Sequence, residues 1–392
     1  MDAVQTERIR NAILLATAAM YAVGYATHGL VWMLAVAVRE AISKTWRWVP
    51  TSLDRPLVAF VAAAFLSALF SEWRRESLFY STLLSLTVAL SVRTVAAYAV
   101  GGAGRCQRFL MIWVAGGIVA ALWVVVQFDP TGVLLPGTPP LGSNAVGTTL
   151  AVSAVITLSL LIGRAPGGRS WSMAAVLAVL LAGLVATWAR AAWLGAAAGV
   201  VTLIALGVDR RVRLALALLT LLLVGLGAVL LPRWPAGYAE VRSIGSLEAN
   251  KNRITIWRAV PKMIGDHPVV GTGFGTFGLA YPQYRLPNSP DLMPPFAHNL
   301  LLNAAVEMGM FGLVAIVAVC AVGLASSWRW MMRSPRGSPE RTVAATVLAA
   351  LVALLTNQLV DGTVMSVHVG FGFFALLALG AVGDRYLSRL RA

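Results

Sequence analysis

The feature that most constrains the fold of this chain is a series of apolar runs, each about as long as a bilayer is thick. A helix needs about 20 apolar residues to span the hydrocarbon core. Hydrophobic residues make up 58% of the 392 residues, and charged residues only 12%. A water-soluble domain has no interior large enough to bury so much apolar surface. The sequence therefore predicts an all-α integral membrane protein.

Twelve membrane-spanning helices are predicted along the chain. The first two are short, and residues 11–38 could instead form one long tilted helix, which would give eleven spans. The twelve predicted spans are 11–24, 26–43, 56–71, 78–100, 108–128, 144–163, 171–188, 191–207, 212–231, 298–327, 341–360 and 363–383.

The distribution of basic residues decides between these two counts, because cytoplasmic segments of membrane proteins are enriched in Lys and Arg. With twelve spans and both termini in the cytoplasm, 20 of the 31 Lys and Arg lie on the cytoplasmic side. Only Arg74, Arg75 and Arg190 remain in short outer loops, and Arg93 falls within a span. Eleven spans lose this asymmetry, so we prefer twelve.

The long outer segment 232–297 separates nine spans in residues 1–231 from three in residues 298–392. It holds seven Lys and Arg, but long loops are exempt from the orientation rule. In NRITIWRAVPKMI, the apolar residues recur at helical spacing. The segment therefore predicts an amphipathic helix that lies on the membrane or on the helix bundle. The residues of this apolar stripe are Ile254, Trp257, Val260 and Ile264.

Three arginines of the outer face are candidates to bind an anion. Arg190 lies where the apolar stretch 171–207, too long for one span, is predicted to turn near residues 188–190. Arg253 and Arg258 flank a tryptophan on the predicted loop helix. Interfacial arginines often only anchor a protein to headgroups, but a guanidinium also holds phosphate oxygens in bidentate fashion. Of the two loop arginines, Arg253 is the better candidate because it lies in the first helical turn.

The glycine-rich stretch GTGFG, residues 271–275, resembles a nucleotide-binding loop only superficially. It does not follow a strand and does not open a long helix. The outer face of a membrane also holds no ATP. We therefore expect these glycines to form tight turns, and neither a nucleotide nor a nucleic acid is expected as a partner. The net charge of +15 is scattered between apolar runs, which favours membrane orientation and anionic ligands.

The stretch AHNLLLNAAVEMGMFG, which opens the tenth span, carries a polar stripe. Asn299, Asn303 and Glu307 recur every four residues and share one helix face. A polar stripe on a membrane helix faces protein or a wet cavity, and one account of it is a hydrogen-bond network that joins helices. His298 differs because it lies at the boundary with water, where an imidazole acts as a general base near neutral pH.

Two further features bear on the chemistry. Asp361 is predicted at the outer turn after the eleventh span, where it could orient a histidine or arginine, but we prefer the role of a cap for the next helix. The spacing of His, Cys and carboxylate residues predicts no metal site, and Cys106 and Cys320 predict no disulfide. No cofactor is expected. The stretch EWRRE, residues 72–76, is predicted to form a self-neutralising outer turn.

The order of these features resembles the O-antigen ligase family within the wider ligase and polymerase superfamily. The resemblance rests on about twelve spans, on ARAAWLG before one long outer loop, and on three motifs of that loop and the following span. These motifs are RITIWRA from Arg253, HPVVGTGFGTF from His267, and AHNLLLNAAVEMGMFG from Ala297.

The resemblance implies a periplasmic glycosyltransferase of the bacterial inner membrane with the GT-C class of fold. Members of the family transfer a glycan from undecaprenyl pyrophosphate to lipid A-core, without metal or nucleotide and with inversion. Membrane lipids are then further partners. In this chain His298 would be the general base, while Arg190, Arg253, Arg258 and Asn299 would hold the pyrophosphate. Asn303, Glu307 and Asp361 would support them.

Several alternatives remain open at the level of sequence. An O-antigen polymerase uses the same donor with a second lipid-linked glycan as acceptor, and a protein O-oligosaccharyltransferase uses a protein. A lipid-linked glycan transporter needs ionisable residues near the bilayer midplane, on helices interrupted by Gly or Pro. In this chain the charges gather at one face, which favours an enzyme.

Overall fold

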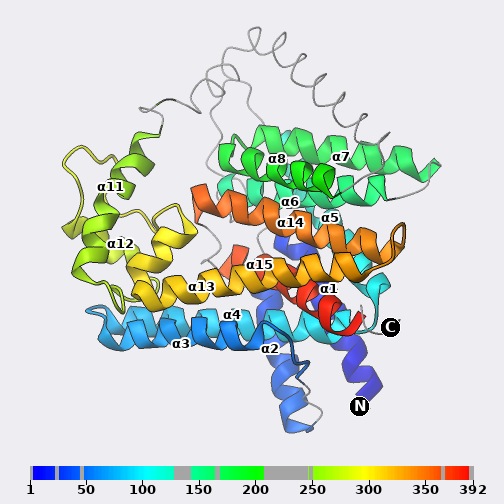
Figure 1. The fold of residues 1–392 in the computed structure, drawn as a ribbon, viewed down its shortest axis with the longest axis horizontal. Coiled ribbons are helices and arrows are strands. Elements are labelled where there is room, and N and C mark those ends of the chain that lie inside the picture. Colours follow the sequence, from blue (N-terminus) through cyan, green and yellow to red (C-terminus); the bar gives the residue numbers. More distant parts are fainter. Residues whose placement is uncertain are drawn as a thin grey trace.

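The chain folds into a bundle of helices (Figure 1). The computed structural model describes residues 3–22, 26–44, 48–127, 143–163, 168–206, 246, 250–362 and 367–387. Within these ranges there are helices and turns and no strand, which confirms the all-α prediction there. The helices are α1 Ala3–Ala22, α2 Ala26–Ile42, α3 Asp54–Phe70, α4 Arg74–Ala99, α5 Ala103–Val126, α6 Ser143–Ile162, α7 Gly168–Ala186, α8 Arg190–Ala205, α11 Lys251–Asp266, α12 Phe277–Ala280, α13 Leu300–Arg333, α14 Pro339–Asp361 and α15 Val367–Val382, with short turns of 3-10 helix at Tyr281–Gln283 and of π-helix at Gly383–Leu387.

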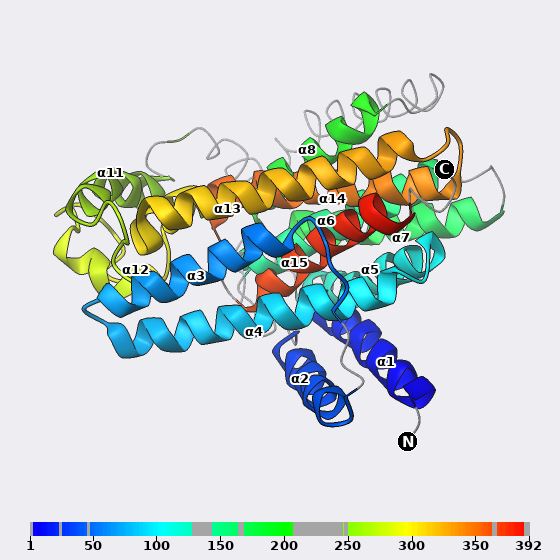
Figure 2. The same ribbon diagram turned by 60° about the horizontal axis from the view of Figure 1, so that its bottom comes forward.

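Helix α14 lies at the centre of the bundle. It packs against α8, α6 and α13, while α13 also packs along α3, and α15 packs along α4. Helices α1 and α2 pack on each other and project from one side of the bundle (Figure 2). They are two separate helices, so the alternative of one long helix over residues 11–38 is not what this region adopts.

Among the described residues, six helices are long and apolar enough to cross a membrane, as expected for a multi-pass membrane protein. They correspond to Arg74–Ala99, Ala103–Val126, Asn144–Ile162, Leu300–Arg333, Pro339–Asp361 and Val369–Leu387. Trp171–Ala186 and Arg190–Ala205 are apolar but shorter. The predicted span 212–231 lies outside the described residues. The total of twelve spans and the likeness to the GT-C fold therefore stay predictions.

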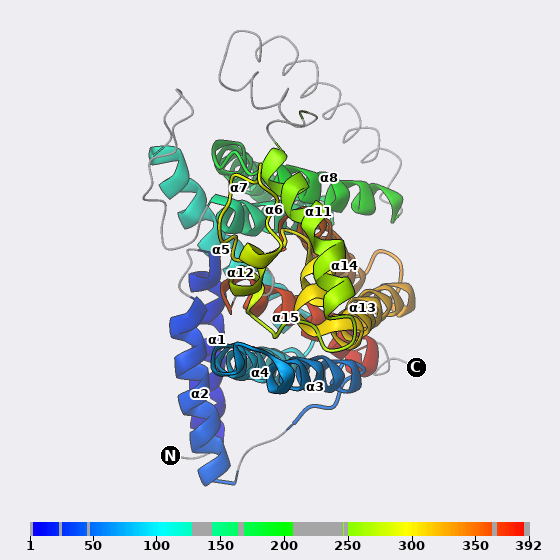
Figure 3. The same cartoon turned by 90° about the vertical axis from the view of Figure 1, so that its left-hand side faces the viewer.

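The described parts of several segments predicted to face outward meet at one end of the bundle, which we call the loop end. Helices α11 and α12 cover this end (Figure 3). The α3–α4 turn reaches the same end, since the Ser71 hydroxyl donates to the Thr272 carbonyl at 2.6 Å. The starts of α6 and α13 and the end of α14 also meet there, through the contacts described below. This arrangement agrees with the predicted alternation of the spans.

Helix α13 bends sharply near its start, at Gly309, where φ is +61°. Because of the bend, the amides that would normally bond to the Val306 and Glu307 carbonyls within the helix no longer face them. The loop before α12 replaces them, because the Thr272 and Gly273 amides donate to these two carbonyls, each at 2.9 Å. In return, the Pro268 carbonyl accepts from the Met310 amide at 2.9 Å. Irregular backbone near membrane depth is tolerated when neighbouring protein satisfies it in this way.

The glycine-rich stretch forms the tight turns expected of it. Gly271, Gly273 and Gly275 all have positive φ, which a residue with a Cβ adopts only with strain. A Cβ on Gly309 would lie 2.3 Å from the Val269 backbone. The glycines therefore allow the loop backbone to reach the backbone of α13.

Helix α11 packs on the bundle and not on an open membrane face. Its buried apolar residues contact Phe277 and Tyr281 of the loop and Val306 of α13. The predicted stripe is wrong in phase, because Val260 is fully buried but the other three residues of the stripe are only half-buried. The reason is that α11 packs on two sides, against the loop and against α13, so its buried face is wider than one stripe. The residues buried along α11 are Thr255, Ile256, Ala259, Val260 and Met263.

A buried ion cluster joins the first helices far from the loop end. Arg93, the arginine within a predicted span, is 1% exposed at its side chain and pairs with Glu40 of α2. Glu40 also pairs with Arg10 of α1 at 3.2 Å. Because an unpaired charge is costly in a membrane, this cluster holds α1 and α2 against α4.

We expect a reporter fused within residues 240–290 to appear in the periplasm and one fused within 330–338 in the cytoplasm. The reason is the asymmetry of basic residues together with the meeting of the predicted outer segments at one end. Alkaline phosphatase and green fluorescent protein fusions measure this directly. Reporters in the reverse compartments would overturn both the topology and the outer-face site.

Candidate active site

His298 lies at the loop end, immediately before α13. Its φ of +51° is a left-handed conformation that is unusual for a residue with a side chain. Asn299 follows as the N-cap of α13, and its side-chain oxygen accepts from the Leu301 and Leu302 amides at 2.9 and 3.0 Å. Residues held in a left-handed conformation like that of His298 cluster at functional sites. The His298 side chain is 16% exposed, so a substrate can reach it.

Asp361, at the end of α14, faces His298. Its carboxylate is completely buried, and one oxygen lies 3.5 Å from His298 Nδ1. This distance is long for a hydrogen bond, as catalytic contacts often are before substrate binds. The same oxygen accepts from the Asn144 side chain of α6 at 3.1 Å. Of the two roles expected for Asp361, the geometry favours orientation of the histidine over capping of the next helix.

Gly362 brings the two sides of this pair together. It follows Asp361 with φ +28°, and a Cβ there would lie 2.9 Å from the Asn299 nitrogen. The Asn299 side-chain amide also donates to the Leu359 carbonyl at 2.8 Å. The backbone at the start of α13 therefore packs directly on the end of α14, and this sets the separation of His298 and Asp361.

Two arginines add positive charge to the same region. Burial lowers the pKa of the Arg253 guanidinium below its usual value; the nearby Asp361 carboxylate opposes this shift, and Arg190 adds to it. Arg253 thus lies within electrostatic reach of both Asp361 and Arg190. Arg190 is the first residue of α8, where the helix dipole is positive and favours anions. The turn before it confirms the break predicted near residues 188–190.

The polar stripe below His298 makes internal hydrogen bonds. The Asn303 side-chain oxygen accepts from the Ala297 amide at 2.9 Å, and its nitrogen donates to Glu307 Oε2 at 2.9 Å. The other Glu307 oxygen accepts from the Phe277 amide at 3.1 Å. Asn303 and Glu307 are both buried, so they hold the backbone on either side of the site and do not contact substrate.

The two other residues predicted to bind pyrophosphate, Asn299 and Arg258, have less direct places at the site. The side-chain oxygen of Asn299 accepts hydrogen bonds from α13, and its side-chain nitrogen donates to α14, as described above. Asn299 therefore positions the two helices. Arg258 is exposed on α11 and lies five residues from Arg253, which places the two on different faces of the helix. Contact of either residue with pyrophosphate stays a prediction.

The sequence analysis missed Asn144 and the polar residues beneath it. The Thr148 hydroxyl of α6 donates to Asn357 Oδ1 of α14 at 3.0 Å, and Gln358 donates to the same oxygen at 2.8 Å. Together with the hydrogen bond between Asn144 and Asp361, these bonds form a row of polar contacts between α6 and α14 that extends along the helices below Asp361. The sequence did contain one signal. Asn144 is a polar residue at the start of an apolar run, and His298 and Asn299 stand at the start of another.

The arrangement joins a partly exposed imidazole, a buried carboxylate and two guanidinium groups. An imidazole held by a carboxylate can take a proton from a hydroxyl group. Guanidinium groups at a helix N-terminus can hold phosphate oxygens. Among the described residues, no group of three or more His, Cys, Asp and Glu side chains could hold a metal ion. The site therefore has the parts for group transfer from a phosphate-bearing donor to a hydroxyl.

These features define a class of protein: an α-helical membrane protein in which a histidine, a buried carboxylate and arginines meet at one end of the bundle. Comparison with known families agrees with this class. Residues 174–317 match the model of a family described as O-antigen ligase, which confirms the resemblance inferred from the motifs. The match supports a function of the O-antigen ligase and polymerase type, that of a glycosyltransferase-like membrane enzyme of polysaccharide assembly. At a coarse level it also implies lipid-linked glycans and membrane lipids as partners.

The matched range runs from within α7 into α13. It includes the three arginines, His298 and the polar stripe, but neither Asn144 nor Asp361. No curated protein matches the chain.

We expect Gly362→Ala to remove activity and to lower stability by more than the roughly 1–2 kcal/mol that a left-handed conformation alone costs a residue with a Cβ, because this Cβ would also lie 2.9 Å from the Asn299 nitrogen. Its Cβ forces the Asn299 backbone away from α14 and separates His298 from Asp361. Gly337→Ala is the matched control, because Gly337 also has positive φ but has open space around its Cβ position. The measurements are thermal unfolding and glycan transfer by both purified variants. Equal activity of the two variants would show that the close approach at Gly362 is unimportant.

Proposed function

We propose that this protein is an O-antigen ligase of the bacterial inner membrane. In this proposal it transfers O-antigen polysaccharide from undecaprenyl pyrophosphate to lipid A-core on the periplasmic face. The observation that carries the proposal is the convergence of His298, Asp361 and Arg253 at the loop end, with Arg190 in electrostatic reach. The site lies where a lipid-linked donor anchored in the membrane meets water.

The two arginines bind the pyrophosphate of the donor. As the glycosidic bond to pyrophosphate breaks, negative charge grows on the departing phosphate oxygen. Preorganised cations that face this charge lower the barrier because they strengthen their interaction in the transition state. The N-terminus of α8 adds to the same field. No metal or nucleotide is needed in this scheme, because the chain's own residues supply the positive charge.

His298 accepts the proton of the acceptor hydroxyl. Its Nδ1 is the nitrogen nearest to Asp361, so Nδ1 carries the proton in the neutral ring and donates to the carboxylate. Nε2 is then free to accept the proton as the hydroxyl attacks the anomeric carbon. The buried Asp361 carboxylate stabilises the imidazolium that forms. Direct attack from the side opposite pyrophosphate inverts the anomeric configuration.

A polymerase is the nearest second candidate, since it differs only in the acceptor. A protein O-oligosaccharyltransferase differs in the same way. The experiment that tests the proposal incubates the purified protein with undecaprenyl-pyrophosphate glycan and with lipid A-core, without added metal or ATP. Transfer to lipid A-core supports the ligase. Glycan chains that lengthen on the lipid carrier alone would identify a polymerase, and no transfer to any acceptor would argue against the class.

We expect Arg190→Ala and Arg253→Ala each to lower turnover by about 10²–10³-fold, the loss typical when one charge-stabilising donor is removed. The Lys variants should recover little, because an ammonium lacks the planar fork that holds two phosphate oxygens. Arg74→Ala, at an exposed outer turn, is the control and should leave turnover unchanged. Arg258→Ala measures whether that exposed arginine shares in the binding. A Lys variant with turnover near that of the wild type would show that the arginine at this position is a membrane anchor and does not hold the pyrophosphate.

We expect His298→Ala and His298→Gln to abolish ligation while donor binding is kept. Glutamine can form hydrogen bonds but cannot take a proton at neutral pH, so the two variants should be about equally inactive. Asp361→Asn should be partly active, because it loses the charge but keeps the shape. The measurements are ligation rate and donor binding by monodisperse protein. Substantial activity of the Gln variant would leave His298 with positioning alone, and loss of donor binding would place it among the pyrophosphate ligands.

A further inference from the structure

In the described part of the chain, the Asp361 carboxylate has one hydrogen-bond partner besides His298, and that partner is Asn144. Its Oδ1 lies 3.5 Å from His298 Nδ1 and accepts from the Asn144 side-chain amide at 3.1 Å. Its Oδ2 is buried and has no hydrogen-bond partner among the described residues. The hydrogen bond from Asn144 is the shorter of the two contacts, so it sets the direction in which the carboxylate points.

The row of polar contacts between α6 and α14 keeps one register along both helices. From the first contact to the second is one turn of four residues on each helix, and from the second to a third is eleven residues, or about three turns. The side-chain pairs are Asn144 with Asp361 at 3.1 Å, Thr148 with Asn357 at 3.0 Å and Ser159 with Thr346 at 2.7 Å. Because the steps on the two helices are equal, neither helix can slip along the other without breaking the whole row. The row therefore fixes the height of Asn144 relative to Asp361.

The start of α6 is also in close contact with α8. A Cβ on Gly147 would lie 2.5 Å from the Ala189 Cβ, in the turn before α8. A Cβ on Gly195 of α8 would lie 2.5 Å from the Ala353 carbonyl oxygen of α14. The backbones of three helices thus approach one another closely near the site, and the backbone that carries Asn144 has little room to move.

An asparagine suits this place because it donates a hydrogen bond without adding a charge. In the proposed reaction, the Asp361 carboxylate stabilises the imidazolium that forms when His298 takes a proton. A cation in the place of Asn144 would compete with the imidazolium for the carboxylate. The side-chain amide does not titrate near neutral pH, so the negative charge stays available for the histidine.

We propose that Asn144 is a positioning residue for the reaction. Its amide holds the Asp361 carboxylate toward His298 Nδ1 and so keeps the imidazole in the tautomer whose Nε2 accepts a proton. Asn144 acts through Asp361 and does not touch the substrate. The inference rests on the proposed function for the reaction that the imidazole serves.

The tautomer of His298 tests the proposal apart from catalysis. The chain has four histidines, so full-length protein with isotope-labelled histidine gives few ring-nitrogen NMR signals, and the spectrum of His298→Gln identifies those of His298. Nitrogen chemical shifts distinguish a protonated ring nitrogen from an unprotonated one. Asn144→Leu keeps the approximate size of the side chain and removes the donor. Asn144→Ser is a second variant, whose hydroxyl is too short to reach the carboxylate.

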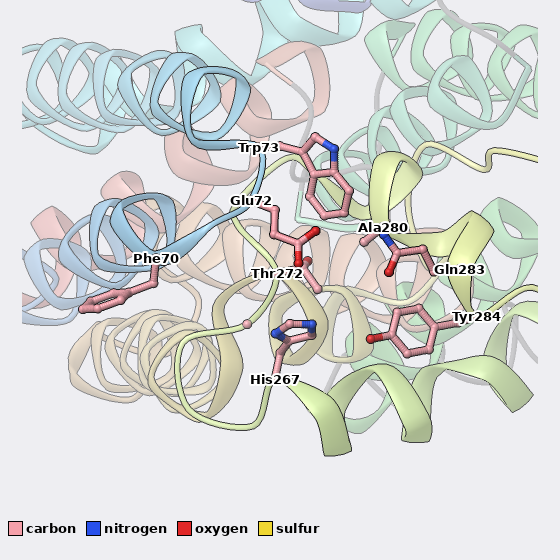
Figure 4. A pocket seen from close by; sticks show the side chains of 9 residues that line it. Phe70, Glu72, Trp73, His267, Thr272, Ala280, Gln283 and Tyr284 are labelled. Carbon is pink, nitrogen blue, oxygen red and sulfur yellow. The ribbon is translucent and has the colours of Figure 1, made fainter.

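Two controls separate this hydrogen bond from its surroundings. Ser159→Ala removes another hydrogen bond of the same row, about 22 Å along α6 from Asn144. Glu72→Gln removes a carboxylate at the loop end, from a small pocket that residues of neither α6 nor α14 line. Figure 4 shows Glu72 facing the His267 ring across this pocket, so this change should move the signals of His267 and not those of His298. Thermal unfolding shows that each variant is folded.

We expect the wild type and both controls to hold His298 with its proton on Nδ1. The two Asn144 variants should give a mixture of tautomers, because the carboxylate no longer points at Nδ1. In glycan transfer they should lower kcat by about 10–100-fold, the loss expected for one hydrogen bond to a charged group, and leave KM for the donor unchanged. In the Asp361→Asn background the same changes should cost less than about 2-fold, since the effects of two residues that act through one contact are not additive.

An unchanged His298 tautomer in both Asn144 variants would overturn the proposal. A tautomer change in Ser159→Ala as large as that in Asn144→Leu would also overturn it, because the packing of the helices would then be the cause. A full loss of kcat in the Asp361→Asn background would overturn it as well, since Asn144 would then act on the substrate by itself. The expected tautomer change in a protein whose wild type transfers no glycan would support the positioning role and remove the ligase.

Discussion

The bent start of α13 is the element on which the rest of the loop end depends. At Gly309 the helix gives up two of its own hydrogen bonds, and the loop before α12 takes their place through the Thr272 and Gly273 amides. Glu307 adds a bond to the Phe277 amide at the start of α12. The Glu307 carbonyl also accepts from the Ser67 hydroxyl of α3, whereas the Val306 carbonyl is bonded by Thr272 of the loop; a backbone carbonyl left unpaired at membrane depth costs several kcal/mol. The loop is therefore fixed on the bundle, and so are the residues it carries.

Two surfaces meet at this element. On the side of α14, the Gly362 backbone presses on Asn299 and sets His298 against Asp361. On the side of the α3–α4 turn, the Ser71 hydroxyl donates to the Thr272 carbonyl of the same loop. The short segment of α13 before the bend is thus held from two sides, which keeps the spacing of His298 and the loop constant.

The sequence predicted the parts of the fold that depend on local pattern. Apolar length and charge asymmetry predicted helices near the observed bounds, and the break before Arg190 is where it was expected. The stripe on α11 was wrong in phase because its packing against both the loop and α13 is a tertiary effect that one-sided periodicity does not report. His298 was singled out because it lies at the predicted boundary with water, where an imidazole can exchange protons. The role of Asn144 was missed because an isolated asparagine is chemically ordinary until its partner Asp361, 217 residues away, is placed beside it.

The bend at Gly309 has a consequence for the way the protein responds to its bilayer. Spanning helices tilt to match the local thickness of the hydrocarbon core. In α13 such a tilt would be taken up at the glycine hinge, because the short segment before it is bonded to the loop and the long segment after it has exposed apolar side chains such as Met310 and Phe311. The contact between His298 and Asp361 is in this way mechanically insulated from the lipid. A cell that remodels its membrane as it grows warmer or colder would leave the geometry of this pair unchanged.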